Sequence, residues 1–574
     1  MKHGGMSFCP SGLGRLFSAR LLVIFIILFA TLGFVQLLFL TLNIGKEATY
    51  ISTCHYIGKL ISALSRRVEQ GSLEINDLML KLNHTFAYPD NASSKLGSSH
   101  EVLRRRALHF VRELRNIIST AQLTDTNKEN GVHDRSVLEE IIRLLQVDLI
   151  GLGQVDGLAK YRISELDRLA KIVRARIDLL QNPADCSQAR VLVVELNRPC
   201  GFGCNVHHLA HCFQLSYFSG RTLVLSSGSR PFHKWWKENF LPVSPACSAI
   251  EFSTNLPAFD WTLKQTSSRA ISCPYIGDLP DFKWLPPAVP RDIALSLSNV
   301  HAAPSAWFIG QLINYLMRPT EQLASTLNAT LSDLNLLEGQ RSPIVGVHVR
   351  RTDKVGTEAS FHGIEEYLSH VNRRFQIWET QKLMMSRTHE WRDDVLSAQL
   401  RSSDIQRRVL LATDDPSVVR EARTAYPEYV FYANTDRINS AGVARRHEHD
   451  SITGVVLDIL LLSKTDYLVC TFSSQVCRVA YELMQTRHTE LGDASELAQS
   501  LDDVYYFGGQ QSWPYEAIVS DEVSRAKPGD LFHIAGNHWN GLAVVQKVGP
   551  GHERVFAPAY KFFPQRSVLN HSLV

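Results

Sequence analysis

The chain has 574 residues, so several domains are expected rather than a single core. Its 60 lysines and arginines almost balance its 57 aspartates and glutamates, and a formal charge of +3 gives no support for nucleic acid as the main partner. Ten cysteines fit neither a dense disulfide scaffold nor an array of zinc fingers.

The first predicted element is an apolar run over residues 21–42. As a helix it can cross the ~30 Å hydrocarbon core of a bilayer. Basic residues precede the run, so the positive-inside rule keeps residues 1–20 in the cytoplasm and the rest in a lumen or outside. A cleaved signal peptide is the alternative, but the run is longer than an h-region and no A-x-A site closes it. We therefore expect the uncleaved anchor of a single-pass type II protein, in an oxidising compartment where cysteines can pair.

A helical pattern follows from about residue 60 to residue 181, with apolar residues at three- and four-residue steps. Residues 125–134 form a polar break, and Asn182-Pro183 is expected to stop the last helix. We expect residues 43–182 to form a helical stem, which would suit a dimer contact. Packing against the next domain of the same chain is the alternative, and the pattern leaves it open.

Residues 183–343 are predicted to form a first α/β region. Its strand, loop, helix and second strand are expected over residues 189–196, 200–204, 206–218 and 221–225. Gly201 and Gly203 in the loop would let the backbone approach a phosphate or a sugar closely. A tight turn explains these glycines equally well.

Residues 344–349 read Ile-Val-Gly-Val-His-Val, which predicts a strand buried on both faces. The residues after it are dense in charge, as in a loop at the carboxyl end of a strand, where ligands of open α/β sheets bind. Arg350 and Arg351 indicate an anionic ligand, because the guanidinium fork fits phosphate oxygens. Asp353, Lys354 and Glu358 could act on a bound substrate. The simpler alternative is a surface loop of solvated charges.

A second α/β region is predicted over residues 344–500. Further strands are expected at residues 409–413, 429–432 and 467–470, and helices at residues 452–463 and 475–484. Hydroxyl residues before the last helix would cap it or bind phosphate, and capping alone is a sufficient explanation. Asp458 lies among aliphatic residues and could accept hydrogen bonds from guanine or face solvent. Residues 380–407 are predicted to be a surface excursion.

Residues 501–564 contain short aromatic-rich runs spaced as in an SH3 domain, a small β-barrel. Strands are expected over residues 504–507, 528–532, 538–542 and 557–560. Behind a membrane anchor, binding of proline-rich peptides is a less natural role than contact with an acceptor or support of the fold. Residues 565–574 are expected to be a C-terminal tail.

Together these features resemble the family of eukaryotic Golgi α1,6-fucosyltransferases that modify the N-glycan core, over nearly the whole chain. The resemblance is carried by His348-Val-Arg-Arg-Thr-Asp-Lys-Val-Gly-Thr-Glu358, Thr413-Asp-Asp-Pro416 and Cys470-Thr-Phe-Ser-Ser-Gln-Val-Cys-Arg-Val-Ala-Tyr-Glu482. It implies an α/β fold: a GT-B-like catalytic region with Rossmann-type βαβ units, after a helical coiled stem and before an SH3-like β-barrel.

The resemblance further implies an inverting glycosyltransferase in the Golgi membrane that moves L-fucose from GDP-fucose to O6 of the asparagine-linked GlcNAc of N-glycoproteins. It implies no cofactor and no divalent metal, which agrees with the lack of an Asp-x-Asp motif in the chain. Expected partners are the N-glycoprotein acceptor, GDP-fucose, the Golgi membrane and a second copy bound through the stem, and no nucleic acid.

The same resemblance implies roles for individual residues. Glu358 is the expected base with Lys354 beside it, Arg350 contacts the β-phosphate and Arg351 supports the loop. Other residues implied for activity or donor binding are Asp353, His348, Tyr367, Asp414, Asp415, Asp458, Ser474, Gly201 and Gly203. Acceptor contacts are expected near Arg198, Asp278, Asp503 and His538.

The resemblance also places three disulfides, Cys186–Cys247, Cys200–Cys204 and Cys470–Cys477. A fourth family pair includes Cys212, but Val194 stands at its partner's position. A Cys212–Cys273 bond is therefore a hypothesis. Two competing functions are a non-catalytic scaffold and a protein O-fucosyltransferase; the intact charged loop argues against the first, and the stem and terminal β module against the second.

Overall fold

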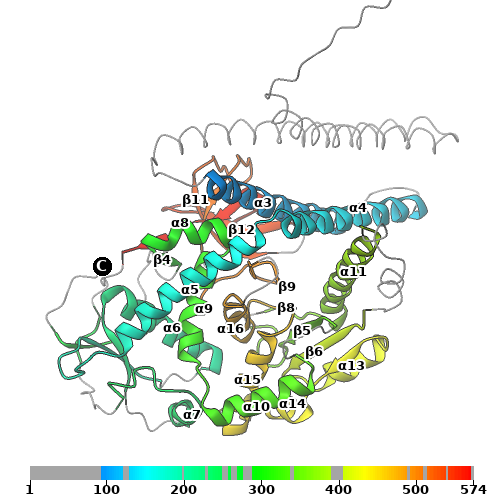
Figure 1. Cartoon of the computed structure of the whole chain (residues 1–574). Coiled ribbons are helices and arrows are strands. Elements are labelled where there is room, and N and C mark those ends of the chain that lie inside the picture. Colours follow the sequence, from blue (N-terminus) through cyan, green and yellow to red (C-terminus); the bar gives the residue numbers. More distant parts are fainter. Residues whose placement is uncertain are drawn as a thin grey trace, which may run out of the picture. The chain divides into compact units, whose positions relative to one another are not determined.

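The structure, a computed structural model, describes residues 92–574 apart from short gaps. These gaps are residues 121–127, 197–199, 227–230, 249–255, 260–267, 276–286, 337–341, 358, 389–404, 446, 488–491, 509–512, 538–540, 566 and 571–574. The described residues belong to one compact unit (Figure 1). The predicted anchor at residues 21–42 lies outside them. In the part of the chain that the structure describes, no helix combines the length and apolarity needed to cross a membrane.

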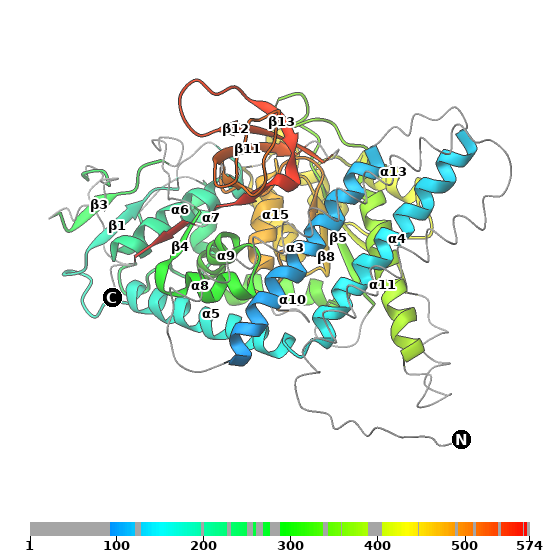
Figure 2. The ribbon, with the colours of Figure 1, turned by 90° about the horizontal axis from the view of Figure 1, so that it is seen from above.

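Three long helices open the described part: α3 (Ala92–Thr120), α4 (Lys128–Val155) and α5 (Ala159–Gln181). α3 and α4 pack side by side (Figures 1 and 2). α5 ends at Gln181, and Asn182 caps it, as the Asn-Pro pair predicts. The polar break predicted for residues 125–134 is wrong from Lys128 onward, because a run of polar residues without proline does not by itself end a helix.

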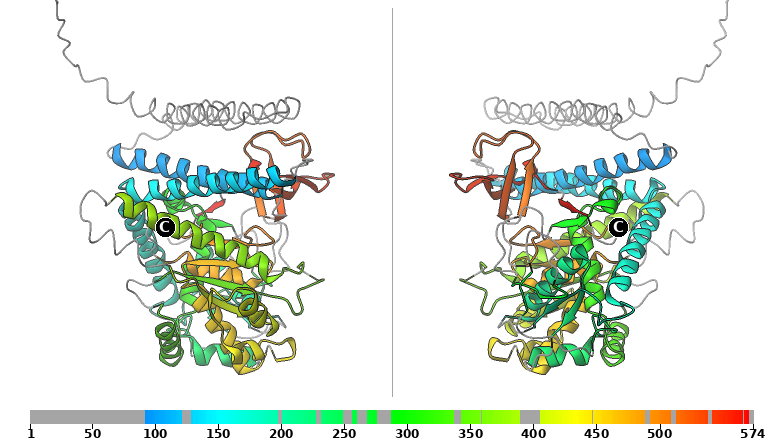
Figure 3. Two further views of the ribbon diagram at one scale, coloured as in Figure 1. Left: turned by 90° about the vertical axis from the view of Figure 1, so that its right-hand side faces the viewer. Right: turned by 90° about the vertical axis from the view of Figure 1, so that its left-hand side faces the viewer.

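These helices pack against the rest of the same chain. α5 and α3 contact α8 (Arg291–Val300), and α4 contacts α11 (Ile364–Thr388). α5 turns Leu166, Leu169, Val173 and Ile177 inward along one face, and all four are buried in the main core. In both side views of Figure 3, α3 and α4 lie across one end of the unit, above the parallel strands. The packing alternative therefore describes α3 to α5, while the dimer contact through a stem stays a prediction.

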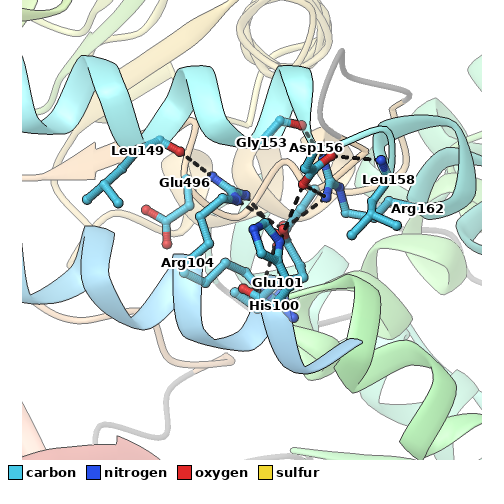
Figure 4. Close-up of polar contacts among 12 residues, drawn as sticks. His100, Glu101, Arg104, Leu149, Gly153, Asp156, Leu158, Arg162 and Glu496 are labelled. Carbon is cyan, nitrogen blue, oxygen red and sulfur yellow. Dashed lines mark hydrogen bonds and ion pairs between the residues drawn. The ribbon is translucent and has the colours of Figure 1, made fainter. Parts of the chain in front are cut away.

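A buried ion network connects α3, α4 and α5 (Figure 4). Glu101 on α3 accepts hydrogen bonds from Arg104 at 2.9 and 2.8 Å and from Arg162 of α5 at 3.0 Å. Arg162 is 1% exposed and also pairs with Asp156, which follows α4, at 3.0 Å. Since each charge has an opposite partner, the network holds the three helices together without a buried unpaired ion.

The first α/β region contains a three-stranded parallel sheet of β1 (Val191–Val194), β2 (Thr222–Leu225) and β3 (Ala270–Ser272), in the order β2-β1-β3. α6 (Phe202–Ser219) connects β1 to β2, so the predicted βαβ unit is confirmed. The loop predicted through Cys204 is wrong, because Gly201 caps a helix that already begins at Phe202. The remaining elements of this region are α7 (Pro231–Asn239), β4 (Ala288–Pro290), α8, α9 (Pro304–Leu316) and α10 (Glu321–Asp333).

The second α/β region is built on a five-stranded, fully parallel sheet in the order β7-β6-β5-β8-β9. Its strands are β5 (Ile344–Val349), β6 (Arg408–Thr413), β7 (Val430–Tyr432), β8 (Tyr467–Cys470) and β9 (Ala498–Ser500). Its helices are α11, α13 (Ser417–Ala425), α14 (Thr435–Ser440), α15 (His449–Leu462) and α16 (Gln475–Met484), with a 3-10 turn η2 (Val443–Arg445).

The central strand β5 is buried along its whole length, as its apolar sequence predicts. The strands β6, β7 and β8 and the helices α15 and α16 also lie where the apolar runs place them, whereas β9 was not predicted. The surface excursion predicted from residue 380 is wrong at its start, because α11 continues through Thr388.

The two α/β regions meet through helices at close distance. α9 and α6 both pack on α16, and the apolar residues of all three belong to one core. A Cβ on Gly310 of α9 would overlap the carbonyl oxygen of Glu482, so only glycine fits there. A Cβ on Gly203 of α6 would lie 3.0 Å from the backbone carbonyl carbon of Gln475. The mixed α/β fold is therefore confirmed, while its assignment to the GT-B type stays a prediction.

The chain ends in an antiparallel sheet in the order β13-β12-β11-β10-β14. Its elements are β10 (Trp513–Ala517), β11 (Leu531–Asn537), β12 (Leu542–Lys547), β13 (Val555–Pro558), the 3-10 turn η3 (Ala559–Lys561) and β14 (Phe562–Pro564). The sheet packs on α3, where the His109 and Phe563 rings meet edge to face with centroids 5.1 Å apart. The identification as an SH3-like barrel stays a prediction.

Several expectations about this end of the chain differ from the structure. The run at 528–532 is a strand only from Leu531, and the run at 557–560 only through Pro558. Residues 504–507 form no strand; Tyr506 and Phe507 are buried, and Arg478 donates a hydrogen bond to the Tyr506 carbonyl at 3.1 Å. Residues 565–574 are more than a tail, because β15 (Ser567–Leu569) pairs in parallel with β4. Short strands formed with partners distant in sequence escape detection by local pattern.

All four expected disulfides are present: Cys186–Cys247, Cys200–Cys204, Cys470–Cys477 and Cys212–Cys273. The hypothesis for Cys212 is thus confirmed. Its bond joins α6 to the segment directly after β3.

Substitution Glu101→Ala should lower the free energy of unfolding by about 3–5 kcal/mol, because it leaves Arg104 and Arg162 buried without this carboxylate. Urea unfolding of the full-length chain, followed by fluorescence, measures the change. Glu165→Ala is the matched control, since it removes only an exposed pair with Arg168 and should change stability by less than about 1 kcal/mol. Equal effects of the two substitutions would contradict a stabilising network.

Candidate functional site

The candidate site lies at one edge of the five-stranded sheet. Because all five strands are parallel, the segments after their carboxyl ends gather at this edge. These segments are residues 350–359 after β5, 414–416 after β6, 471–474 after β8 and 501–503 after β9. The edge therefore brings together most of the residues that the sequence predicts for a donor site.

Arg350 is held in place by two carboxylates. Its guanidinium forms ion pairs with Asp353 in the same loop and with Asp414 after β6, and its side chain is only 17% exposed. Asp414 is buried and also accepts hydrogen bonds from the backbone N–H groups of Arg351 at 2.9 Å and Thr352 at 3.2 Å. The Thr352 hydroxyl donates to the same carboxylate. Asp414 thus fixes both the loop backbone and the direction of the Arg350 side chain.

The Arg351 side chain is buried under the loop and holds the loop in place. It pairs with Asp415 at 3.4 Å and with Glu421 of α13 at 3.0 Å, and its guanidinium carbon lies 4.7 Å from the centre of the Phe361 ring. Burial opposes ionisation of Asp415, but hydrogen bonds from Ser417 and Arg351 outweigh it and hold the Asp415 pKa below its ordinary value. Sequence reasoning missed Glu421, whose only signal is its spacing one helical turn after Ser417.

The rest of the loop folds into a compact turn. The Lys354 carbonyl accepts hydrogen bonds from the backbone N–H groups of Thr357 at 3.2 Å and Ala359 at 3.1 Å. Gly356 has a φ of +80°, a left-handed conformation that glycine adopts without strain. The turn follows directly after Asp353, a partner of Arg350. Glu358, the predicted base, falls outside the described residues.

His348 and Tyr367 lie beneath the loop. His348 is 6% exposed, and burial lowers its pKa to about 4 in spite of the neighbouring Asp414, so its ring is neutral near pH 7. Tyr367 of α11 is 1% exposed, and burial raises the pKa of its hydroxyl well above the ordinary value. Both side chains are part of the packing under the site.

The amino terminus of α16 forms a second side of the edge. Ser474 stands at the N-cap position of this helix and is buried, but its side chain makes no capping hydrogen bond. The preceding residue, Ser473, donates its backbone N–H to Asp502 at 3.2 Å. Asp503 lies next to that carboxylate; burial, together with Asp502, raises the Asp503 pKa to about 6, although Arg478 opposes the shift. Of the predicted acceptor residues, Asp503 is the one that the structure describes.

The first α/β region reaches this edge through the amino terminus of α6. Gly203 packs directly on Gln475, the first residue of α16, which accounts for a glycine there. At Gly201, by contrast, a Cβ would meet no atom within 4 Å. His207 of α6 bridges the two helices, with Nδ1 2.8 Å from Gln475 and Nε2 3.0 Å from buried Glu482. Two helix amino termini, each with unpaired backbone N–H groups, thus meet at one place.

Asp458 on α15 is paired rather than exposed. Arg437 of α14 donates a hydrogen bond to it at 2.7 Å, and its side chain is 17% exposed, so the solvent-facing alternative is wrong. Burial raises the Asp458 pKa to about 6, and Arg437 limits the shift. Sequence reasoning missed Arg437, because no local pattern relates α14 to α15.

Arg198, Asp278 and His538, the other predicted acceptor residues, lie outside the described residues. Within the described part of the chain, one group could offer three ligands to a metal ion: His100, Glu101 and Asp156. Both of its carboxylates are paired with Arg162, so a cation there would have to displace a buried guanidinium (Figure 4). This group is explained by the helix network, and the absence of a metal requirement stays a prediction.

Comparison with known proteins gives the family. Residues 62–506 match the family model described as "Alpha-(1,6)-fucosyltransferase N- and catalytic domains". An "Alpha-(1,6)-fucosyltransferase" of Drosophila melanogaster is 37% identical over 472 residues, 79% of this chain and 71% of that protein. One of Caenorhabditis elegans is 36% identical over 439 residues, 73% of each chain.

Among solved structures, the fucosyltransferase NodZ from Bradyrhizobium matches with 14% identity and a TM-score of 0.29, over 50% of this chain and 91% of that chain. The family model and the two animal relatives decide the assignment. The chain belongs to the alpha-(1,6)-fucosyltransferase family and is a glycosyltransferase.

Proposed function

We propose that this family member transfers L-fucose from GDP-fucose to O6 of the asparagine-linked GlcNAc of N-glycans, with inversion at the anomeric carbon. The observation that supports this most is the position of Arg350. It is held by Asp353 and Asp414 at the carboxyl edge of a parallel sheet, beside two helix amino termini. A sugar nucleotide carries its charge on the pyrophosphate, and both guanidinium groups and helix amino termini bind phosphate.

In this proposal Arg350 binds the β-phosphate and stabilises the charge that develops on departing GDP. Its two carboxylate partners orient it before the donor arrives, so no reorganisation is needed during the reaction. Arg351 acts indirectly, by supporting the loop through Asp415 and Glu421. Ser474 and the α16 amino terminus bind the diphosphate from the other side. The arginine charge neutralises the pyrophosphate of the donor, as a divalent ion does in other enzymes. No metal or other cofactor is therefore required.

The guanosine part would lie against His348 and Asp458. Ionised Asp458 can accept hydrogen bonds from N1–H and N2–H of guanine, and Arg437 holds the carboxylate in place. Neutral His348 and the buried ring of Tyr367 support this side of the pocket from within the fold. Gly201, with open space at its Cβ position, can accept a ligand close to the backbone.

Inversion at the anomeric carbon requires one in-line displacement and therefore one base on the acceptor side. A primary hydroxyl is only weakly acidic, and a positioned carboxylate accelerates its attack. We assign this role to Glu358, which follows the turn that carries Lys354 and Gly356. Lys354 keeps Glu358 ionised in the free enzyme and then neutralises or relays the abstracted proton.

The acceptor would be an N-glycoprotein bound through Arg198, Asp278, Asp503 and His538, with the terminal β module next to the site. The apolar run at residues 21–42 supports a single-pass type II protein of the Golgi membrane, with the catalytic part in the lumen. A homodimer formed through the helical segment completes the proposal.

The decisive test is incubation of the purified chain with GDP-fucose and a core N-glycan that bears a terminal GlcNAc on its α1,3 arm. Linkage analysis of the product should find fucose α-linked to O6 of the innermost GlcNAc. The absence of product, or fucose at another position, would reject the proposed donor, acceptor or regiochemistry.

Substitution Arg350→Ala should lower kcat/KM by about 10³-fold or more, because the leaving group loses its main charge partner. Circular dichroism should be unchanged, since Asp414 keeps its backbone hydrogen bonds. Arg420→Ala, an exposed arginine on α13, is the matched control and should retain full activity. A folded Arg350→Ala enzyme with most of its activity would refute the assigned role.

The pH dependence of donor use tests Asp458. Its pKa is raised to about 6, and only the ionised form accepts both hydrogen bonds from guanine. Below pH 6, kcat/KM for GDP-fucose should therefore fall by about tenfold per pH unit through an increase in KM. GDP-fucose is the suitable probe because its pyrophosphate, unlike that of GDP, does not titrate near pH 6.

Asp458→Asn should show a high KM that no longer depends on pH in this range. Asp436→Asn, an exposed residue on neighbouring α14, should behave like the wild type. An unchanged KM in Asp458→Asn would remove this residue from the donor site.

A further inference from the structure

A cavity of about 70 Å³ lies between α3, α4, α11 and the segment before β9, away from the candidate site. Tyr467, the first residue of β8, lines it, so the cavity is at the amino end of the parallel strands, whereas the Arg350 loop is at their carboxyl ends. Six arginines line this small space: Arg104, Arg105, Arg112, Arg115, Arg373 and Arg374. The carboxylates in its wall are those of Asp493 and Glu496.

Three of the arginines have carboxylate partners. Arg104 pairs with Glu101 at 2.8 Å. Arg105 pairs with Asp493 at 3.3 Å, and Arg112 forms an ion pair with Glu496. Arg374 lies over aromatic rings, with its guanidinium carbon 4.6 Å from the centre of Trp378 and 4.9 Å from that of Tyr467. The wall carboxylates are therefore already engaged by Arg105 and Arg112.

Arg115 and Arg373 are left on opposite sides of the cavity. In the described part of the chain, neither forms an ion pair with a carboxylate, although Arg115 is only 6% exposed. Burial, followed by repulsion from Arg373, lowers the Arg115 pKa to about 9, so it remains charged at neutral pH. Glu113 compensates Arg115 only in part, because burial raises the Glu113 pKa to about 7, and Glu139 is the carboxylate that attracts Arg373. A buried cation that is balanced only in part is costly, and an anion in the cavity would lower that cost.

The neutral ring of His370 lines the same space. Burial and the neighbouring Arg373 lower its pKa to about 3, so the ring is uncharged. A nitrogen of the Arg373 guanidinium lies 3.3 Å from His370 Nδ1, which must accept that hydrogen bond. The ring proton is then on Nε2.

We propose that this cavity binds one tetrahedral oxyanion, phosphate or sulfate, which neutralises Arg115 and Arg373 and fastens the α3–α4 pair to α11. The cavity volume of about 70 Å³ exceeds the roughly 10–15 Å³ that admits one water, so a small ion has room in it. Hydrogen-bond donors reach the cavity from two helices on different sides of it, α3 and α11. Tetrahedral oxygens accept hydrogen bonds in several directions at once, whereas a planar carboxylate is satisfied by one guanidinium fork.

Thermal unfolding of the full-length chain in mild detergent tests the site. Sodium phosphate or sodium sulfate replaces chloride at constant ionic strength, with and without saturating GDP. Each oxyanion should raise Tm by about 2 °C or more in a saturable manner, and GDP should leave the rise intact. A linear rise without saturation, or a rise that GDP abolishes, would overturn the proposal, because the ion would then act on the solvent or in the donor site.

Arg115→Gln should remove the Tm response to phosphate and sulfate while basal Tm stays equal or rises, because repulsion from Arg373 is relieved. Arg168→Gln, at an exposed arginine of α5, is the control and should keep the response. If Arg115→Gln does not fold, Arg373→Gln gives the same test. A variant that folds and keeps the full response would overturn the proposal.

Isothermal titration calorimetry with inorganic phosphate gives an independent measurement. About one ion per chain should bind to the wild type and none to the variant. Glycerol 3-phosphate distinguishes the source of the anion: binding with similar affinity indicates that a phosphate ester can enter, and failure to bind indicates the free ion. Lack of binding by both phosphate and sulfate to the wild type would reject the site.

Discussion

The ion pair between Asp414 and Arg350 is the interaction on which the candidate site depends. A single buried carboxylate receives the guanidinium, two backbone N–H groups and a hydroxyl from residues 350–352. The loop is therefore attached to the adjacent strand before any ligand is present. Such an arrangement gives a cation that is fixed in direction yet close to the surface, as recognition of a phosphate requires.

The site also depends on how closely the two α/β regions meet. Gly203 and Gly310 allow α6 and α9 to approach α16 at distances that a side chain would prevent. Buried hydrogen bonds then fix how these helices align. The Glu482 carboxylate lies 3.0 Å from His207 and 2.7 Å from the Tyr505 hydroxyl. Polar groups at such depth are tolerated only when each has a partner, so they favour one relative position of the helices.

Several arginines are buried in the fold, and their charges are balanced in different ways. Arg162 is balanced by two carboxylates, and Arg478 is held by backbone carbonyls and by the Tyr506 ring, 3.8 Å from its guanidinium carbon. Arg350 and Arg351 share four acidic partners at the sheet edge. The cavity lined by Arg115 and Arg373 differs from all of these, because its positive charge exceeds that of its own carboxylates.

The sequence by itself determined the elements whose signal is local. Apolar runs located β1, β5, β6 and β8, and the charged residues after β5 and β6 identified the edge at which the site lies. The family resemblance supplied three of the cysteine pairs, and the fourth, Cys212–Cys273, was a hypothesis that the structure confirms. Only the tertiary structure decided which charges are paired: Glu421 with Arg351, Arg437 with Asp458, and Glu101 with Arg162. These partners come from separate elements, and their contact depends on packing between helices and strands that no local periodicity encodes. For the same reason β15 and the helical turn at Phe202 could not be predicted from their own residues.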